Sequence, residues 1–267
     1  MLTRFIRNAV MAVVVTLLFG TMTGQAFAQE KPPVQPIRVL FVGNSQIFYN
    51  DLPRMLERLA ESAPADRRRV QAERALAGGA SLESHWNKGD GKGTPRAKIA
   101  EGGSDFVVIQ EIYNGKPDSF TKHARLFHDL IRQHGGKTIL FSTASISTQY
   151  PKGFQVLHDM HIQVGQELKV PVAAAGQAWR TYWGQEPTVE VRLALYAPDK
   201  AHPGQKGSYL YACVLYAAIT GQSPVGLTNQ VQKPNEDTVS LAEAKRMQDA
   251  AWKVHQEMNP KEPVAKP

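Results

Sequence analysis

Five short apolar runs alternate with longer amphipathic segments along this chain. The runs, the first with its closing turn included, cover residues 37–45, 70–76, 105–110, 137–142 and 170–174. Apolar residues at helical spacing predict helices over 46–63, 119–134, 153–169, 204–220 and 240–258. Parallel strands need such crossover helices, which cover both faces of the sheet. The alternation therefore predicts an α/β fold with a mostly parallel sheet of about five strands.

The first run ends in Gly43-Asn44-Ser45, and this turn is the first candidate for chemistry. Ser45 is predicted between a buried strand and the positive end of a helix, at the carboxyl edge where open α/β sheets place their chemistry. In that helix Asp51 is positioned to cap, and Pro53 suits the first turn. The alternative is an ordinary strand-to-helix turn, which uses Gly, Asn and Ser for backbone reasons alone.

Glycine or polar residues also follow the next two runs. Gly78-Gly79 comes after the second run, where paired glycines permit an amide aimed at a ligand but are also common loop punctuation. Gln110 ends the third run, whose strand is expected beside the first. The glycine-rich stretch 88–103 between them predicts a surface loop.

Asp199 and His202 lie late in the chain, just before Pro203 and the apolar helix 204–220. Proline suits the first turn of a helix, so this lead-in is constrained. Acyl transfer needs a nucleophile, a base for its proton, a group that orients the base, and donors for the oxyanion. The chain offers Ser45 as nucleophile, His202 as general base and Asp199 as the orienting group.

Three groups are candidate donors to the oxyanion of such a reaction: the amide of Ser45, the amide of Gly79 and the side-chain amide of Gln110. A neutral amide suits this task because it donates a hydrogen bond without adding a competing charge. Asn44 and Gly78 flank these donors and are candidates for substrate contact.

With these blocks in this order, the sequence resembles the SGNH or GDSL-like hydrolases over residues 37–227. The turn at 43–45 is similar to the nucleophile block, which is commonly Gly-Asp-Ser, and residues 199–203 (Asp-Lys-Ala-His-Pro) resemble the Asp-x-x-His block. Residues 78–82 lie where the family's glycine block supplies an oxyanion amide. The resemblance implies a flavodoxin-like three-layer α/β/α fold and the activity of a serine esterase, lipase or carbohydrate O-acetylesterase.

Gln110 is the largest departure from the family pattern. It stands at the strand end where many members have the Asn of a Gly-x-Asn-Asp block. The glutamine amide still donates a hydrogen bond, but its side chain is longer by one methylene.

Aromatic residues near these blocks are candidates to line a pocket. His85-Trp86 follows the glycine block, and Trp179 follows the fifth run. An indole in such a position could stack on a sugar face. For both tryptophans, a packing role is the alternative.

His158 and His161 form a His-x-x-His pair on the helix 153–169, a spacing compatible with a metal site. We favour a partly buried histidine instead, because His161 falls in the helix's apolar stripe and no carboxylate partner is evident. The turn at 43–45 lacks the Gly-Lys-Ser/Thr ending of a phosphate-binding loop. We therefore expect neither a metal nor a cofactor.

Residues 1–28 have the pattern of a secretory signal peptide. Arg4 and Arg7 precede the apolar run 9–19, and residues 26–28 (Ala-Phe-Ala) form a small-x-small cleavage signature. We expect cleavage after Ala28 and a periplasmic or secreted protein, with an uncleaved amino-terminal anchor as the alternative. The remaining chain divides into an extended leader, a single domain and a disordered tail: residues 29–36, 37–258 and 259–267.

The net charge limits the kinds of binding partner, and the cysteine count limits the possible cross-links. Loss of residues 1–28 lowers the formal charge from +7 to +5, and no dense Lys/Arg face with interleaved aromatics accompanies it. We expect no nucleic-acid partner, and no membrane contact beyond export. Cys213 is the only cysteine, which excludes an internal disulfide, and its apolar helical setting predicts a buried thiol.

The sequence thus predicts an exported, metal-independent serine ester hydrolase. By the family resemblance, its substrate is a small-molecule or carbohydrate ester with a small acyl group. The alternatives are a non-catalytic carbohydrate-binding protein of the same fold and a long-chain lipase or thioesterase.

Overall fold

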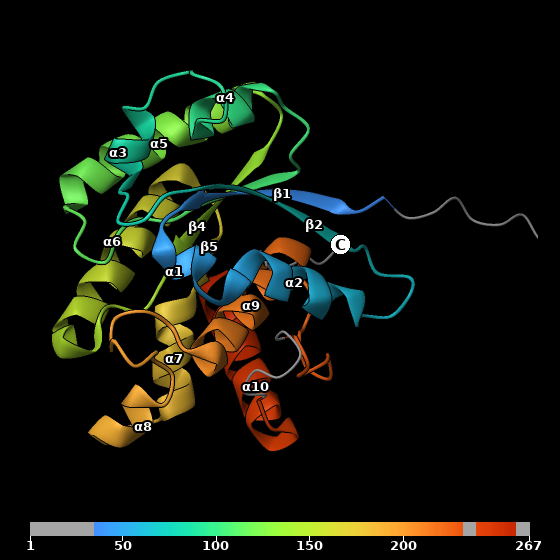
Figure 1. Ribbon diagram of the computed structural model, residues 1–267, viewed down its shortest axis with the longest axis vertical. Coiled ribbons are helices and arrows are strands. Elements are labelled where there is room, and N and C mark those ends of the chain that lie inside the picture. Colours follow the sequence, from blue (N-terminus) through green and yellow to red (C-terminus); the bar gives the residue numbers. More distant parts are fainter. Residues whose placement is uncertain (1–34, 232–238, 260–267) are drawn as a thin grey trace, which may run out of the picture. The chain divides into compact units, whose positions relative to one another are not determined.

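The computed structural model describes residues 35–231 and 239–259. Within them, five parallel strands form a sheet in the order β2-β1-β3-β4-β5 (Figure 1). The strands are β1 (Ile37–Gly43), β2 (Val70–Leu76), β3 (Phe106–Ile109), β4 (Lys137–Ser142) and β5 (Val172–Ala174). The predicted parallel sheet is confirmed, and β1 is paired on both sides.

Helices cover both faces of the sheet. They are α1 (Ser45–Phe48), α2 (Leu52–Glu61), α3 (Leu82–Trp86), α4 (Pro95–Ala100), α5 (Pro117–Gln133), α6 (Lys152–Leu168), α7 (Ala175–Trp183), α8 (Val189–Leu193), α9 (Gln205–Thr220) and α10 (Leu241–Met258). Helices α3 to α6 pack on one side, and α2, α7, α9 and α10 on the other (Figure 1). The three-layer α/β/α arrangement is thereby confirmed.

The helix predicted over 46–63 is interrupted after its first turn. Asn50 (φ 56°, ψ 18°) and Asp51 (φ 51°, ψ 52°) adopt left-handed conformations between α1 and α2. Asp51 precedes α2 but makes no side-chain capping bond, and its carboxylate instead pairs with Arg74 at 2.6 Å. Apolar spacing identifies α2 but not this interruption, because left-handed residues leave no periodic signal.

The loop predicted over 88–103 contains α4, so that prediction is wrong in this part. The Thr94 hydroxyl accepts a hydrogen bond from the Ala97 amide, and Pro95 occupies the first turn. These are ordinary signals of a helix start. Helices α3, α7 and α8 are likewise absent from the sequence prediction, whereas the capping box Ser240–Glu243 and the helix it opens are as predicted.

His161 and Cys213 belong to the core. His161 is 1% exposed, its Nδ1 lies 2.7 Å from the Leu157 carbonyl oxygen, and its ring lies 4.4 Å from that of Phe120. Burial lowers the pKa of His161 to about 4 and raises that of Cys213 to about 12. The packing interpretation of both residues is confirmed. Across the described part of the chain, no three potential metal-ligating side chains gather.

The predicted signal peptide lies outside the described residues, as do most of the leader and the tail. Within 35–231 and 239–259, no helix is both long and apolar enough to cross a bilayer.

Candidate active site

The turn after β1 is built around Asn44. Its side-chain oxygen accepts a hydrogen bond from the Gln46 amide at 3.1 Å, which caps α1, and its Nδ2 donates to the Ala80 carbonyl at 2.9 Å. Asn44 is 1% exposed, so the prediction that it contacts substrate is wrong. It joins the turn after β1 to the turn after β2, and it leaves Ser45 as the first residue of α1.

The structure brings Ser45, His202 and Asp199 together, although Ser45 and His202 are 157 positions apart. Ser45 Oγ lies 2.8 Å from His202 Nε2, and His202 Nδ1 lies 2.6 Å from Asp199 Oδ2. An ionised carboxylate can only accept, so Nδ1 carries the proton and Nε2 is free to accept the Ser45 hydroxyl proton. This is the hydrogen-bonded chain of nucleophile, base and orienting group that acyl transfer uses.

Asp199 is held by backbone amides as well as by the imidazole. Its Oδ1 accepts from the amides of Ala201 at 3.0 Å and His202 at 2.9 Å. Burial raises the pKa of Asp199, but the hydrogen bonds from His202 and Ala201 outweigh it and lower the pKa to about 2. The carboxylate is therefore ionised at any pH well above 2.

The loop that carries this pair is fixed on both sides. The Ala197 amide donates to the His202 carbonyl at 2.9 Å, and the Ser147 amide donates to the Lys200 carbonyl at 3.0 Å. Lys200 has a left-handed backbone (φ 58°) at the tip. Pro203 forms an antiparallel bridge with Tyr196 just before α9 begins.

Gly78 and Gly79 form an exposed turn beside Ser45. The Ala77 amide donates to the Gly43 carbonyl at 3.1 Å, and the Ala80 amide closes the turn on the Ala77 carbonyl at 3.2 Å. Gly79 has φ +65°, a conformation that favours glycine. Among the described residues, the amides of Ser45 and Gly79 have no hydrogen-bond acceptor.

Gln110 is fully buried at the end of β3. Its Oε1 accepts the Asn44 amide at 3.0 Å, and its Nε2 donates to the Glu111 carbonyl. A Cβ on Gly43 would lie 2.6 Å from this Oε1 and 2.7 Å from Ile47 Cδ1, so any larger residue at position 43 would force these side chains to move. Because Gln110 is fully buried and both ends of its amide bond to the protein backbone, the prediction that it donates to an oxyanion is wrong.

Glu111 is a site residue that the sequence reasoning missed. The carboxylate is 2% exposed and accepts the amides of Leu82 at 3.2 Å and Ile112 at 2.8 Å. It thus joins the turn after β3 to the start of α3, directly after the glycine turn. Burial raises the pKa of Glu111 to about 7, although both amide hydrogen bonds lower it. The position of Glu111 just after a buried strand is the sequence signal that could have identified it.

We expect Glu111→Gln to change how stability depends on pH. Because the pKa is raised in the folded state, the wild-type protein loses stability as the pH rises from the ordinary value near 4.5 through about 7. Over that window the free energy of unfolding of the wild type should fall by about 2–3 kcal/mol relative to the variant. Urea unfolding of both proteins at several pH values measures this difference, and parallel curves would contradict it.

His85 and Trp86 are placed by packing. His85 is 1% exposed, and its Nε2 lies 2.8 Å from the Gly43 carbonyl, beneath the nucleophile turn. Burial lowers the pKa of His85. Trp86 is half-buried, with its ring edge-on to Phe127 and the Arg96 guanidinium 4.5 Å from its centre. The prediction of substrate contact is wrong for His85, and the packing alternative describes Trp86.

Trp179 is fully buried, so its predicted role in stacking on a sugar is wrong. Its ring packs 5.2 Å from Tyr211 and 4.9 Å from Tyr196. Helix α7 begins at Ala175, directly after β5, and turns Trp179 into the layer of helices.

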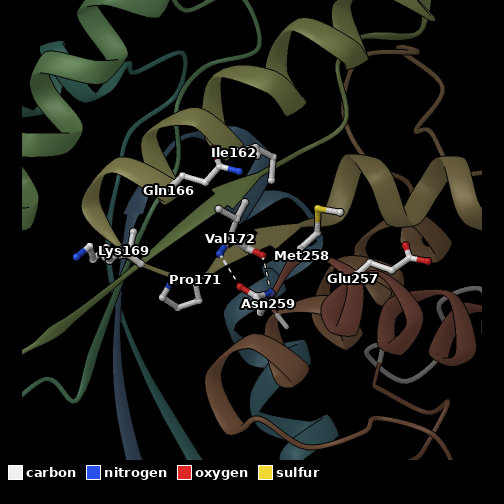
Figure 2. A pocket seen from close by; sticks show the side chains of 10 residues that line it. Ile162, Gln166, Lys169, Pro171, Val172, Glu257, Met258 and Asn259 are labelled. Carbon is white, nitrogen blue, oxygen red and sulfur yellow. Dashed lines mark hydrogen bonds between the residues drawn. The ribbon is translucent and has the colours of Figure 1, made fainter. Parts of the chain in front are cut away.

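Two cavities lie at opposite edges of the sheet. One, of about 530 Å³, adjoins Val172 at the amino end of β5, where the Asn259 side chain bonds both backbone groups of Val172 (Figure 2). The other, of about 500 Å³, lies between residues 113–115 after β3 and residues 148–153 after β4. Of these two, the second lies at the carboxyl edge of the sheet, and its lining does not include Ser45, Asp199 or His202.

Comparisons with known proteins rest on structure, because no protein-family model and no curated protein matches the sequence. A DUF4886 family protein from Bacteroides uniformis shares 17% identity over 86% of this chain and 97% of its own, with a TM-score of 0.63. Axe2, an acetylxylan esterase from Geobacillus stearothermophilus, shares 13% identity over 70% and 95%, with a TM-score of 0.54. A Desulfitobacterium hafniense protein described as lipolytic and of the G-D-S-L family shares 12% over 68% and 99%, with a TM-score of 0.52. At these identities the likeness establishes the fold alone, a three-layer α/β/α arrangement that this chain shares with these solved structures.

Proposed function

We propose that this chain is an exported serine ester hydrolase that forms an acyl-enzyme on Ser45 and removes small acyl groups, including O-acetyl groups on carbohydrate. The observation that carries the proposal is the hydrogen-bonded chain from Ser45 through His202 to Asp199. The fold, shared with solved esterases, supports it. Export rests on the pattern of residues 1–28 alone.

In the proposed reaction, Ser45 Oγ attacks the ester carbonyl carbon while His202 Nε2 takes its proton. The oxyanion of the tetrahedral intermediate would accept hydrogen bonds from the amides of Ser45 and Gly79. Collapse expels the alcohol, which leaves with the proton from His202. A water molecule, deprotonated by His202, then attacks the acyl-enzyme and releases the acid, and the proton returns to Ser45.

A non-catalytic binding protein is the competing proposal, and the arrangement of the groups around Ser45 argues against it. A binding site needs neither an imidazole 2.8 Å from the serine oxygen nor a carboxylate on the far ring nitrogen. The two exposed glycines leave an amide open beside Ser45, as an oxyanion site requires. These features together favour chemistry at Ser45.

Labelling with a fluorophosphonate tests the proposal. The wild-type protein should take up one label per chain and hydrolyse p-nitrophenyl acetate, whereas Ser45→Ala should take up none and lose roughly 10⁴- to 10⁶-fold in kcat. Ser84→Ala, which removes an exposed hydroxyl on α3, is the matched control and should behave as wild type. Equal labelling of wild type and Ser45→Ala, or of neither, would overturn the proposal.

Acyl size is tested with the same variants. Among p-nitrophenyl esters we expect kcat/KM to be highest for acetate and to fall as the acyl chain lengthens. If kcat/KM were highest for long acyl chains, of roughly eight or more carbons, the lipase or thioesterase alternative would replace the small-acyl proposal. Release of acetate from acetylated oligosaccharides then tests the carbohydrate part directly.

A further inference from the structure

The five residues after Ser45 hold the loop that carries His202. Gln46 Nε2 donates to the Ala201 carbonyl at 3.0 Å. Asn50 Nδ2 donates to the Pro203 carbonyl and to Ser208 Oγ, both at 2.9 Å. Side chains from one short segment thus bind the backbone on both sides of His202.

Tyr49 lies between these two contacts and stacks on the imidazole of His202. The ring centres are 4.6 Å apart, and the planes differ by 8°. The tyrosine therefore covers one face of the imidazole, while Asp199 and Ser45 occupy its two nitrogen atoms. The His202 side chain is 27% exposed. The stack with Tyr49 therefore supplies a substantial part of the packing that holds the imidazole in place.

The backbone that follows Tyr49 is strained. Asn50 and Asp51 are consecutive left-handed residues, neither of them glycine. Such conformations are uncommon and persist where surrounding contacts impose them. Here the contacts are the two hydrogen bonds of Asn50 to the His202 loop and α9, and the ion pair of Asp51 with Arg74.

From this geometry we infer that Tyr49 is a positioning residue for His202 and stabilises it as an imidazolium, with Asn50 holding Tyr49 in place. The inference rests on the proposed function. His202 is hydrogen-bonded to Ser45, and it becomes an imidazolium when it takes the serine proton. The face of an aromatic ring attracts a cation, so the stack strengthens as that charge develops. Tyr49 therefore affects kcat more than substrate binding.

Substitution at position 49 separates the ring from its hydroxyl. Tyr49→Leu removes the aromatic face and should lower kcat by roughly 5- to 30-fold with KM changed less than about twofold. Tyr49→Phe keeps the stack and should retain kcat within about twofold. A melting temperature for each variant shows whether it folds. Full kcat in a folded Tyr49→Leu protein, or an equal loss in Tyr49→Phe, would overturn the inference.

A double-mutant cycle with His202→Ala distinguishes an effect of Tyr49 on the imidazole from a general structural effect. If Tyr49 acts through the imidazole, Tyr49→Leu should have no further effect on the residual hydrolysis once His202 is absent. An equal fold-loss in both backgrounds would show that Tyr49 acts through the general structure instead. Failure of the proposed function looks different, because Ser45→Ala would then hydrolyse p-nitrophenyl acetate as well as the wild type does.

Discussion

Replacement of Asp199 by Asn is expected to lower kcat for ester hydrolysis by roughly 10⁴-fold, with little change in KM. The asparagine oxygen can still accept the amides of Ala201 and His202, so the turn should be preserved. Its NH₂ group, however, would face His202 Nδ1 and donate to it. The imidazole would then carry its proton on Nε2, directed at Ser45, and could not accept the serine proton.

The pH dependence of the wild type follows from the same carboxylate. Because the pKa of Asp199 is lowered to about 2, its contribution to stability is present above its ordinary value and is lost only as the pH falls through about 2. Protonation of Asp199 should therefore not limit the proposed hydrolysis at any pH well above 2. Rates of p-nitrophenyl acetate hydrolysis by the wild type and by Asp199→Asn, measured from pH 4 to 9, test whether protonation of Asp199 limits the rate.

Asp249→Asn is the matched control, since it removes an exposed carboxylate on α10 that pairs with Lys245 at 2.7 Å. It should have wild-type kcat. A folded Asp199→Asn protein with kcat within tenfold of the wild type would show that Asp199 does not orient the base.

Sequence patterns identified the strands and the reacting groups because those signals are local. A buried strand followed by Gly43-Asn44-Ser45 fixes where the hydroxyl leaves the sheet. The three-residue spacing of Asp199 and His202 lets one carboxylate bind both the ring and the backbone of the histidine. A parallel sheet then brings strand ends together whatever their separation in sequence.

The contacts that support these groups could not be predicted in the same way. The position of Trp179 after a strand makes it a candidate to line a pocket, with packing as the alternative, and α7 carries it into the core. Tyr49 meets His202 only because left-handed residues interrupt the helix, and Glu111 is recognised as buried only once α3 lies against it. Each depends on the packing of one element against another, which periodicity does not encode.

Helix α9 packs closely against its neighbours at Gly207. We therefore expect Gly207→Ala to be the most destabilising single-methyl substitution near the site. A Cβ at Gly207 would lie 2.2 Å from the Leu195 carbonyl oxygen and 2.5 Å from Trp179 Cζ2. The carbonyl cannot move freely, because it accepts the Gly204 amide at 2.8 Å. Alanine normally stabilises a helix relative to glycine by about 0.5–1 kcal/mol. Here we expect the opposite sign, a loss of about 3 kcal/mol, as α9 is forced away from its neighbours.

Thermal unfolding measures the effect, and a loss of that size should lower the melting temperature by about 10 °C. Gly91→Ala is the control, since its Cβ would meet no atom closer than 3.8 Å and should leave the melting temperature unchanged. Because Gly204 and Gly207 follow His202 directly into α9, a displaced helix would also shift the imidazole from Ser45. The Gly207→Ala protein should therefore lose esterase activity even below its melting temperature, whereas a merely less stable protein would keep its kcat at low temperature.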